Sequence, residues 1–169
     1  SKKTIYKYFK NKTDLIDGVT NHIFDTISCG IDEICALKGN PIDELFNIKQ
    51  FVMMHLKDEK SSPQYQLQKY YPKIYSSLKQ KQFKVMQGCV LENLKYGIEL
   101  GVYRKGIDIE FISRIYFNGL TGIKDKEMFP LKHYSMKTLM NYYYEYHLRG
   151  ICTPLGLEKL EHQLKINQL

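Results

Sequence analysis

The sequence predicts an all-α protein, a helical bundle without β-sheet. Apolar residues recur every three or four positions along most of the chain, and no segment alternates with a period of two. Glycine, proline and asparagine interrupt this pattern between the helical stretches. The 169 residues are 43% hydrophobic and 25% charged, which is ordinary for a globular protein that buries a core.

The first predicted element is a short, basic helix over residues 2–9. Ser1 is its expected N-cap, because a serine hydroxyl accepts from the free amides of a first turn. Ile5 and Phe9 lie four residues apart and form one small apolar face. Residues 10–12, Lys-Asn-Lys, then form a turn. A short basic and aromatic helix fixed to a longer one is typical of a segment that enters the DNA major groove.

A long helix over Thr13–Leu37 follows, with Asn11 or Thr13 as its cap. Gly30 lies inside this helix and is expected to weaken it by about 1 kcal/mol relative to alanine. Gly39 is the expected C-terminal cap. The helix is expected to bury one apolar stripe, formed by Ile16, Val19, Ile23, Ile27, Ile31 and Ile34.

Most of the later helices begin at a proline or a capping side chain. Pro41 opens one helix at its first turn, and Asp108 and Ser135 cap two others. The predicted spans are Pro41–Lys57, Pro63–Tyr71, the segment after Pro72 to Leu100, Ile109–Ile123, Ser135–Arg149 and Leu155–Leu169.

The net charge of +7 is concentrated at the start of the chain. Five lysines (Lys2, Lys3, Lys7, Lys10 and Lys12) fall within thirteen residues that contain no acid, which leaves +2 for the other 156 residues. Such a patch attracts phosphate, and binding to it should be sensitive to salt. The alternative is a solvated lysine-rich helix with no ligand.

The segment SKKTIYKYFKNKTDL resembles the end of the helix-turn-helix in the TetR family of bacterial transcriptional regulators. The likeness rests on Ser1, Thr4, Ile5, Tyr6, Tyr8, Phe9, Lys12 and Leu15. The later phrases GVYRKGIDIEFI and HLRGICTPLGLEKLE are similar to the regulatory part of such proteins. The family places two further helices before this segment. The resemblance therefore implies that residues 1–12 are a partial helix-turn-helix and residues 13–169 a C-terminal regulatory domain that binds an effector and dimerises.

The resemblance implies contacts with double-stranded operator DNA from the first residues of the chain. The expected DNA-binding residues are Lys2, Lys3, Thr4, Tyr6, Lys7, Tyr8 and Lys12. In such a protein Ile5, Phe9 and Leu15 would hold the small domain together.

A small-molecule effector is expected among the long helix, Pro41–Lys57 and the Tyr70–Ile98 region. Flexible thioethers and tyrosines in these segments suit a mainly apolar ligand with a polar group. The expected pocket residues are Ile27, Ile31, Met53, Met54, Tyr65, Tyr71, Met86 and Val90. The competing interpretation is that they simply fill a core.

A two-fold DNA reader needs two copies of the chain, so a homodimer is predicted. The helices Ile109–Ile123 and Ser135–Arg149 are the expected interface, because Gly119 and a run of aromatic residues exceed what one core needs. The expected interface residues are Ile112, Tyr116, Gly119, Leu120, Leu139, Tyr143 and His147.

The predicted function is a ligand-responsive transcriptional regulator, a repressor released from its operator by a small molecule. The alternative is a helical protein–protein interaction module whose basic end binds something other than an operator. An enzyme is not expected, because the sequence has no glycine-rich phosphate loop, HExxH motif, nucleophile elbow or CxxC pair.

No cofactor, metal or membrane partner is expected. His22 and Cys29 lie seven residues apart and could share a helix face, but so few ligands do not make a zinc site. The scattered cysteines indicate a reducing compartment, and no apolar run approaches the length that crosses a bilayer. A cytoplasmic location is therefore expected.

Overall fold

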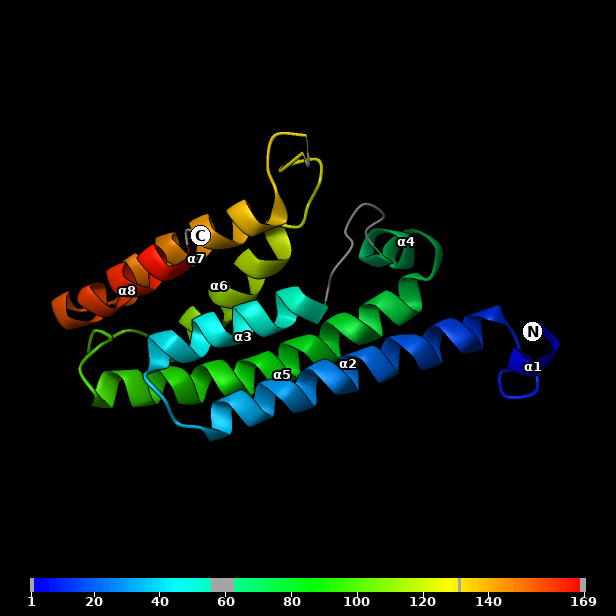
Figure 1. Cartoon of the computed structure of the whole chain (residues 1–169), viewed down its shortest axis with the longest axis horizontal. Coiled ribbons are helices and arrows are strands. Elements are labelled where there is room, and N and C mark those ends of the chain that lie inside the picture. Colours follow the sequence, from blue (N-terminus) through cyan, green and yellow to red (C-terminus); the bar gives the residue numbers. More distant parts are fainter. Residues whose placement is uncertain (1, 56–62, 131, 168–169) are drawn as a thin grey trace. The chain divides into compact units, whose positions relative to one another are not determined.

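The computed structural model describes residues 2–55, 63–130 and 132–167, and these residues form helices joined by turns and loops (Figure 1). The helices are α1 (Lys2–Ile5), α2 (Lys12–Ala36), α3 (Pro41–His55), α4 (Pro63–Tyr70), α5 (Pro72–Glu99), α6 (Ile109–Gly122), α7 (Met136–Ile151) and α8 (Pro154–Asn167). No β-strand occurs among the described residues, although Tyr103 and Cys152 make an isolated antiparallel bridge. The predicted all-α class is confirmed.

The predicted N-caps of the later helices are confirmed. The Asp108 carboxylate accepts a hydrogen bond from the Phe111 amide at 3.0 Å, and the Ser135 hydroxyl accepts one from the Thr138 amide at 3.1 Å. Each cap satisfies a backbone donor that has no partner inside its helix. These local bonds explain why the starts of α6 and α7 could be read from the sequence.

Two local predictions were wrong. The first helix is shorter than residues 2–9, because it ends at Ile5 and the amides of Lys7 and Tyr8 make turn hydrogen bonds to Thr4 and Ile5. Gly39 is not the residue that turns the chain after α2. Lys38 takes the left-handed conformation, with a φ of 47°, because the helix already ends at Ala36 and the turn follows at once.

The chain divides into two compact units. Unit 1 comprises Ser1–Ala36 and Ile48–Val85, and unit 2 comprises Leu37–Asn47 and Met86–Leu169. Helices α3 and α5 therefore contribute their two halves to different units. The predicted division at residue 12 concerns function and stays a prediction.

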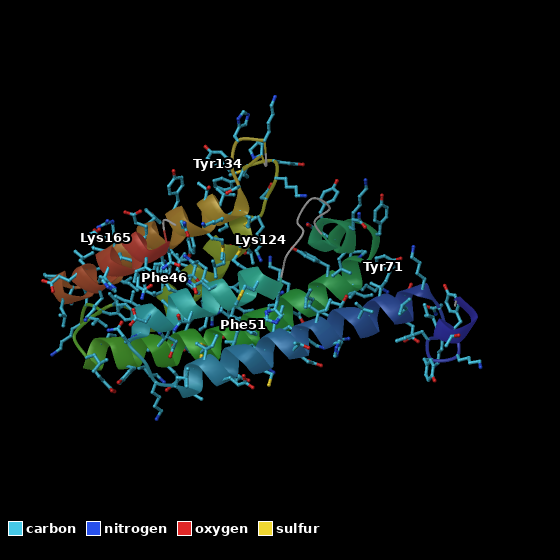
Figure 2. The ribbon with its side chains drawn as sticks, in the orientation of Figure 1. Phe46, Phe51, Tyr71, Lys124, Tyr134 and Lys165 are labelled. Atoms are coloured by element: carbon cyan, nitrogen blue, oxygen red, sulfur yellow. The ribbon has the colours of Figure 1, made fainter. Side chains whose placement is uncertain are left out.

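Unit 2 holds most of the buried side chains of the described residues. Leu160 and Ile42 are fully buried, and Phe46, labelled in Figure 2, packs edge to face on Tyr144 with ring centroids 5.6 Å apart. Helices α6, α7 and α8 supply much of this core, with α7 packed between α6 and α8 in contact with both. Burial of this kind is the main favourable term in folding.

A buried hydrogen-bond network ties three segments of unit 2 together. The side-chain Nδ2 of Asn93 in α5 donates to the backbone carbonyl of Pro41 and to the carboxylate of Glu44, at 2.8 Å each. The Tyr103 hydroxyl donates to the side-chain oxygen (Oδ1) of Asn93 at 3.1 Å. Burial raises the pKa of the Glu44 carboxyl above its ordinary value, and the Asn93 bond opposes this shift. The start of α3, the end of α5 and the following loop are thereby held in one arrangement.

The loop after α5 is fastened to the break between α7 and α8. The Arg104 amide donates to Ile151 O at 2.9 Å, and the Thr153 amide donates to Val102 O at 3.0 Å. Gly156 allows this approach, because a Cβ at that position would overlap the Val102 carbonyl.

In unit 1, α2 runs beside the first half of α5 (Figure 1). The Lys81 ammonium donates to the Asn21 side chain at 2.6 Å. The ring of Phe51 from α3 occupies the space where a Cβ on Gly30 would lie. Gly30 therefore serves close packing, a role that the sequence alone does not indicate.

The expectation of a buried stripe on α2 was wrong. None of its 25 residues is buried, and Val19 and Ile23 are each 47% exposed. The reason lies in the small amount of covering structure in unit 1. The remainder of that unit consists of α1 with its turn, half of α3, α4 and half of α5.

Candidate nucleic-acid interface

The basic start of the chain presents polar and aromatic side chains to solvent. Thr4 and Lys7 are exposed, and Tyr6 and Tyr8 are 52% and 80% exposed. The backbone of α1 includes Lys2 and Lys3, but their side chains lie outside the described part of the chain, as does Ser1. The described DNA-binding candidates in this segment are therefore accessible.

A half-buried contact and a cap fix this segment to α2. The Phe9 ring rests on Gly18, where an added Cβ would come within 2.8 Å of it. The Asn11 side chain accepts from the Asp14 amide at 2.9 Å, and the Asp14 carboxylate accepts from the Lys10 amide at 2.9 Å. Of the two predicted caps, the structure thus selects Asn11. The two bonds resemble a capping box, except that the carboxylate accepts from the residue before the cap, and they define the direction in which the chain enters α2.

Lys12 is the first residue of α2, and its side chain is exposed. The unsatisfied amides of a helix start carry partial positive charge, which adds to the lysine charge. An anion at this position would meet both. Leu15, the predicted packing residue, is half-buried in the same first turns of α2.

An open hollow joins the start of α2 to the start of α5 within unit 1. It is lined by Lys10, Asn11, Thr13, Asp14, Asp17, Lys73, Ile74 and Ser77. The hollow therefore places Lys73 near Lys10, although they are 63 positions apart in the sequence. None of the predicted effector residues lines it.

A second group of lysines was not among the predicted site residues. Between Lys60 and Leu91 the chain contains six lysines and no aspartate or glutamate. The five described members of this group are all exposed: Lys69, Lys73, Lys79, Lys81 and Lys84. The absence of acids over this stretch is the sequence signal for the group. The net charge of +2 for all residues after the first thirteen does not show it, because acids elsewhere in the chain offset these lysines.

All of the predicted dimer residues belong to unit 2, and most of them lie in its interior. Tyr116, Leu120, Leu139 and His147 are each less than a tenth exposed, and Ile112, Gly119 and Tyr143 are half-buried. Four of the seven therefore fill the core of the chain itself. The apolar surface that these helices leave exposed comes from other residues, with Phe111 at 58%, Tyr142 at 63% and Tyr146 at 79%.

Gly119 and Tyr143 meet within the chain. A Cβ on Gly119 would overlap the Tyr143 ring, and the Tyr143 hydroxyl donates to the carbonyls of Ile115 and Tyr116 at 3.1 and 2.9 Å. The small residue thus lets α6 and α7 approach each other. This contact accounts for the glycine without a second copy of the chain.

His147 lies in an aromatic cluster of unit 2. Its ring centroid is 5.1 Å from that of Tyr116 and 5.7 Å from that of Tyr143. Tyr116 in turn donates to the Tyr144 hydroxyl at 2.7 Å. Burial lowers the pKa of His147 from 6.5 to about 4, because the charged imidazolium would lose its hydration.

The predicted effector residues are divided between the two units. In unit 1, Ile27, Ile31, Met53 and Tyr71 are half-buried, and Tyr71 lies at the junction of α4 and α5 (Figure 2). Met54 and Tyr65 are more than half exposed. In unit 2, Val90 is buried and Met86 is half-buried. The pocket itself stays a prediction.

Comparison of the chain with models of known protein families, with curated proteins and with solved structures found no match. Among the described residues, no helix combines the length and the apolar character needed to cross a membrane.

Proposed function

We propose that this protein is a ligand-responsive transcriptional regulator of the TetR type, which represses by binding operator DNA as a homodimer. The main support is the exposed basic and aromatic segment from Thr4 to Lys12, which Phe9 and the Asn11 cap fix to the start of α2. A reader of this kind needs accessible side chains on a backbone with a defined direction.

Within this proposal, different side chains contact the phosphates and the bases. Lys7 and Lys12 contact phosphates, which contributes affinity for every sequence and makes binding depend on salt. Tyr6 and Tyr8 donate hydroxyl protons to phosphate or base oxygens, and Thr4 lies where it can approach base edges. The net charge of unit 1 supports this assignment, since it contains 13 lysines and 7 acids.

The homodimer in this proposal uses the outer faces of α6 and α7. Phe111, Tyr142 and Tyr146 remain exposed there, whereas most of the residues first nominated are already buried in the chain's own core. Aromatic residues are enriched in protein interfaces, which supports this revised placement.

The effector would act by linkage. A small molecule that binds the DNA-free state more tightly weakens DNA binding, and DNA must weaken the affinity for that molecule by the same factor. A ligand found by thermal-shift screening can therefore be titrated with and without DNA. Equal ligand affinity in the two titrations would refute the coupling.

The test of DNA binding begins with selection of duplexes from a random-sequence pool by the full-length protein. We expect enrichment of one sequence and a steep loss of affinity with added salt. Lys12→Ala should lower the salt slope by about one unit and weaken binding to all sequences. Lys165→Ala, an exposed lysine of α8 in unit 2, is the matched control and should leave the slope unchanged.

Changes at Lys3 or Thr4 should instead alter which sequence is preferred. Failure to enrich any duplex, together with binding that does not respond to salt, would reject the regulator. The helical protein-interaction module would then be the better description.

A further inference from the structure

We propose that the exposed lysines of α4 and of the first half of α5 form a second DNA-phosphate contact surface, which extends the contact made by the first residues of the chain. This inference rests on the proposed DNA-binding function. The surface, here called the α4–α5 lysine face, consists of Lys69, Lys73, Lys79, Lys81 and Lys84.

The charge of this face is not balanced along the chain. No aspartate or glutamate lies between Lys60 and Leu91, so none of the usual helical partners at three or four positions is available to these lysines. Exposed lysines are usually interspersed with acids, which limits a field of one sign. A stretch of one sign on two consecutive helices is expected to attract a polyanion.

The spacing on α5 suits an extended row of phosphates. Lys73 and Lys84 are eleven residues apart, close to three turns, so they lie on the same side of the helix about 16 Å apart. By the same geometry Lys81 lies about 80° around the helix from Lys73, where it donates to Asn21 of α2. Lys79 lies about 120° around the helix on the other side. A row of that length spans about five phosphates of one DNA strand, because successive phosphates advance about 3.4 Å along the axis.

Aromatic rings hold the lysine of α4 in place at this face. The Lys69 ammonium lies 5.4 Å from the ring centroid of Tyr70 and 5.9 Å from that of Tyr65. Both tyrosines are more than half exposed, at 64% and 53%. A cation over an aromatic face keeps its charge accessible, and tyrosine hydroxyls also donate to phosphate oxygens.

The face is continuous with the basic segment at the start of α2. Lys73 and Lys10 line the same hollow in unit 1. Asp14 and Asp17 line it as well, and the Asp14 carboxylate accepts from the Lys10 amide, so the hollow itself is a poor phosphate site. The phosphates would instead run along the exposed side of α4 and α5. We assign duplex DNA as the occupant, since the adjoining segment is the proposed DNA reader.

The test measures binding of the full-length protein to random-sequence duplex DNA at several salt concentrations. The combined variant Lys69→Ala, Lys73→Ala, Lys84→Ala should lower the salt slope by about two to three units and reduce affinity at least tenfold at low salt. Sequence preference should not change, because phosphate contacts carry no sequence information. The matched control Lys137→Ala, Lys159→Ala, Lys165→Ala removes three exposed lysines from unit 2 and should leave the slope unchanged.

A charge-preserving arginine variant and the Lys12→Ala variant make the outcomes distinct. The variant Lys69→Arg, Lys73→Arg, Lys84→Arg keeps the charge and should keep the slope, which separates lost charge from lost folding. If the alanine variant keeps the wild-type slope while Lys12→Ala lowers it, the second surface is refuted and the reader stands. If wild-type protein binds no duplex DNA, both proposals fail. Equal losses in the unit 1 and unit 2 variants would also overturn the inference, since net charge alone would explain them.

Discussion

Unit 1 and unit 2 differ in both charge and burial. Unit 1 contains 13 lysines and 7 acids, whereas unit 2 contains 12 lysines and arginines and 11 acids. Among the described residues of unit 1, only Lys49 and Leu67 are buried, and α2 contributes none. Unit 2 holds the remaining buried core, together with the network around Asn93.

The difference assigns separate physical tasks to the two units. Deep burial and satisfied polar groups make unit 2 the main source of stability. The excess positive charge of unit 1 repels itself in the folded state but attracts phosphate, as the proposed DNA binding requires. Segments with few buried contacts open most easily, and binding elements are often of this kind.

The largest expected effect is a contrast between two truncations of equal size. Leu160 in unit 2 is fully buried, and Ile23 in unit 1 is 47% exposed. Leu160→Ala should lower the free energy of unfolding by about 3 to 5 kcal/mol, because it removes buried apolar atoms and leaves a cavity. Ile23→Ala should cost about 1 kcal/mol or less, since about half of the side chain stays in contact with water in the folded protein and alanine favours the helix. Urea unfolding measures both values, and equal losses would mean that α2 is buried in solution.

The same contrast shows what the sequence could predict. The starts of α6 and α7 were predictable because Asp108 and Ser135 act on amides three residues away. Helical periodicity identified the apolar side of α2, but it carries no information on how much structure covers that side. Burial depends on contacts between distant segments, and these are not encoded in local spacing.

The glycines show the same limit. Gly30 and Gly119 contact the rings of Phe51 and Tyr143, which lie 21 and 24 positions further along the chain. A sequence pattern shows that a residue is small, but not which ring will occupy the space. Only one part of the candidate DNA-binding surface could be predicted from the sequence. The lysines before residue 13 form a local run, whereas the proximity of Lys73 to Lys10 requires α5 to lie beside α2.

A smaller effect should appear when the pH is lowered. The pKa of His147 is about 4 in the folded protein, below its ordinary value of 6.5, so the unfolded chain takes up the proton first. Its contribution to stability is present above pH 6.5 and is lost as the pH falls toward 4. Between about pH 7.5 and about pH 5 the loss should be about 2 kcal/mol.

Urea unfolding at the two pH values checks this expectation. His147→Phe keeps an aromatic ring beside Tyr116 and should remove most of the pH dependence. His162→Gln, at an exposed position of α8, should leave that dependence as it is in the wild type. An unchanged pH dependence in His147→Phe would show that His147 is not the group that titrates.

The most direct test of the division between the units is lysine footprinting with and without duplex DNA. A reagent that acetylates exposed lysines is applied to the full-length protein, and mass spectrometry reports the modification at each position. We predict protection of Lys7, Lys12, Lys69, Lys73 and Lys84 in unit 1, because phosphates cover their ammonium groups. Exposed lysines of unit 2, such as Lys137 and Lys165, should be modified equally in both samples. Protection concentrated in unit 2, or spread evenly over both units, would contradict the assignment of DNA binding to unit 1.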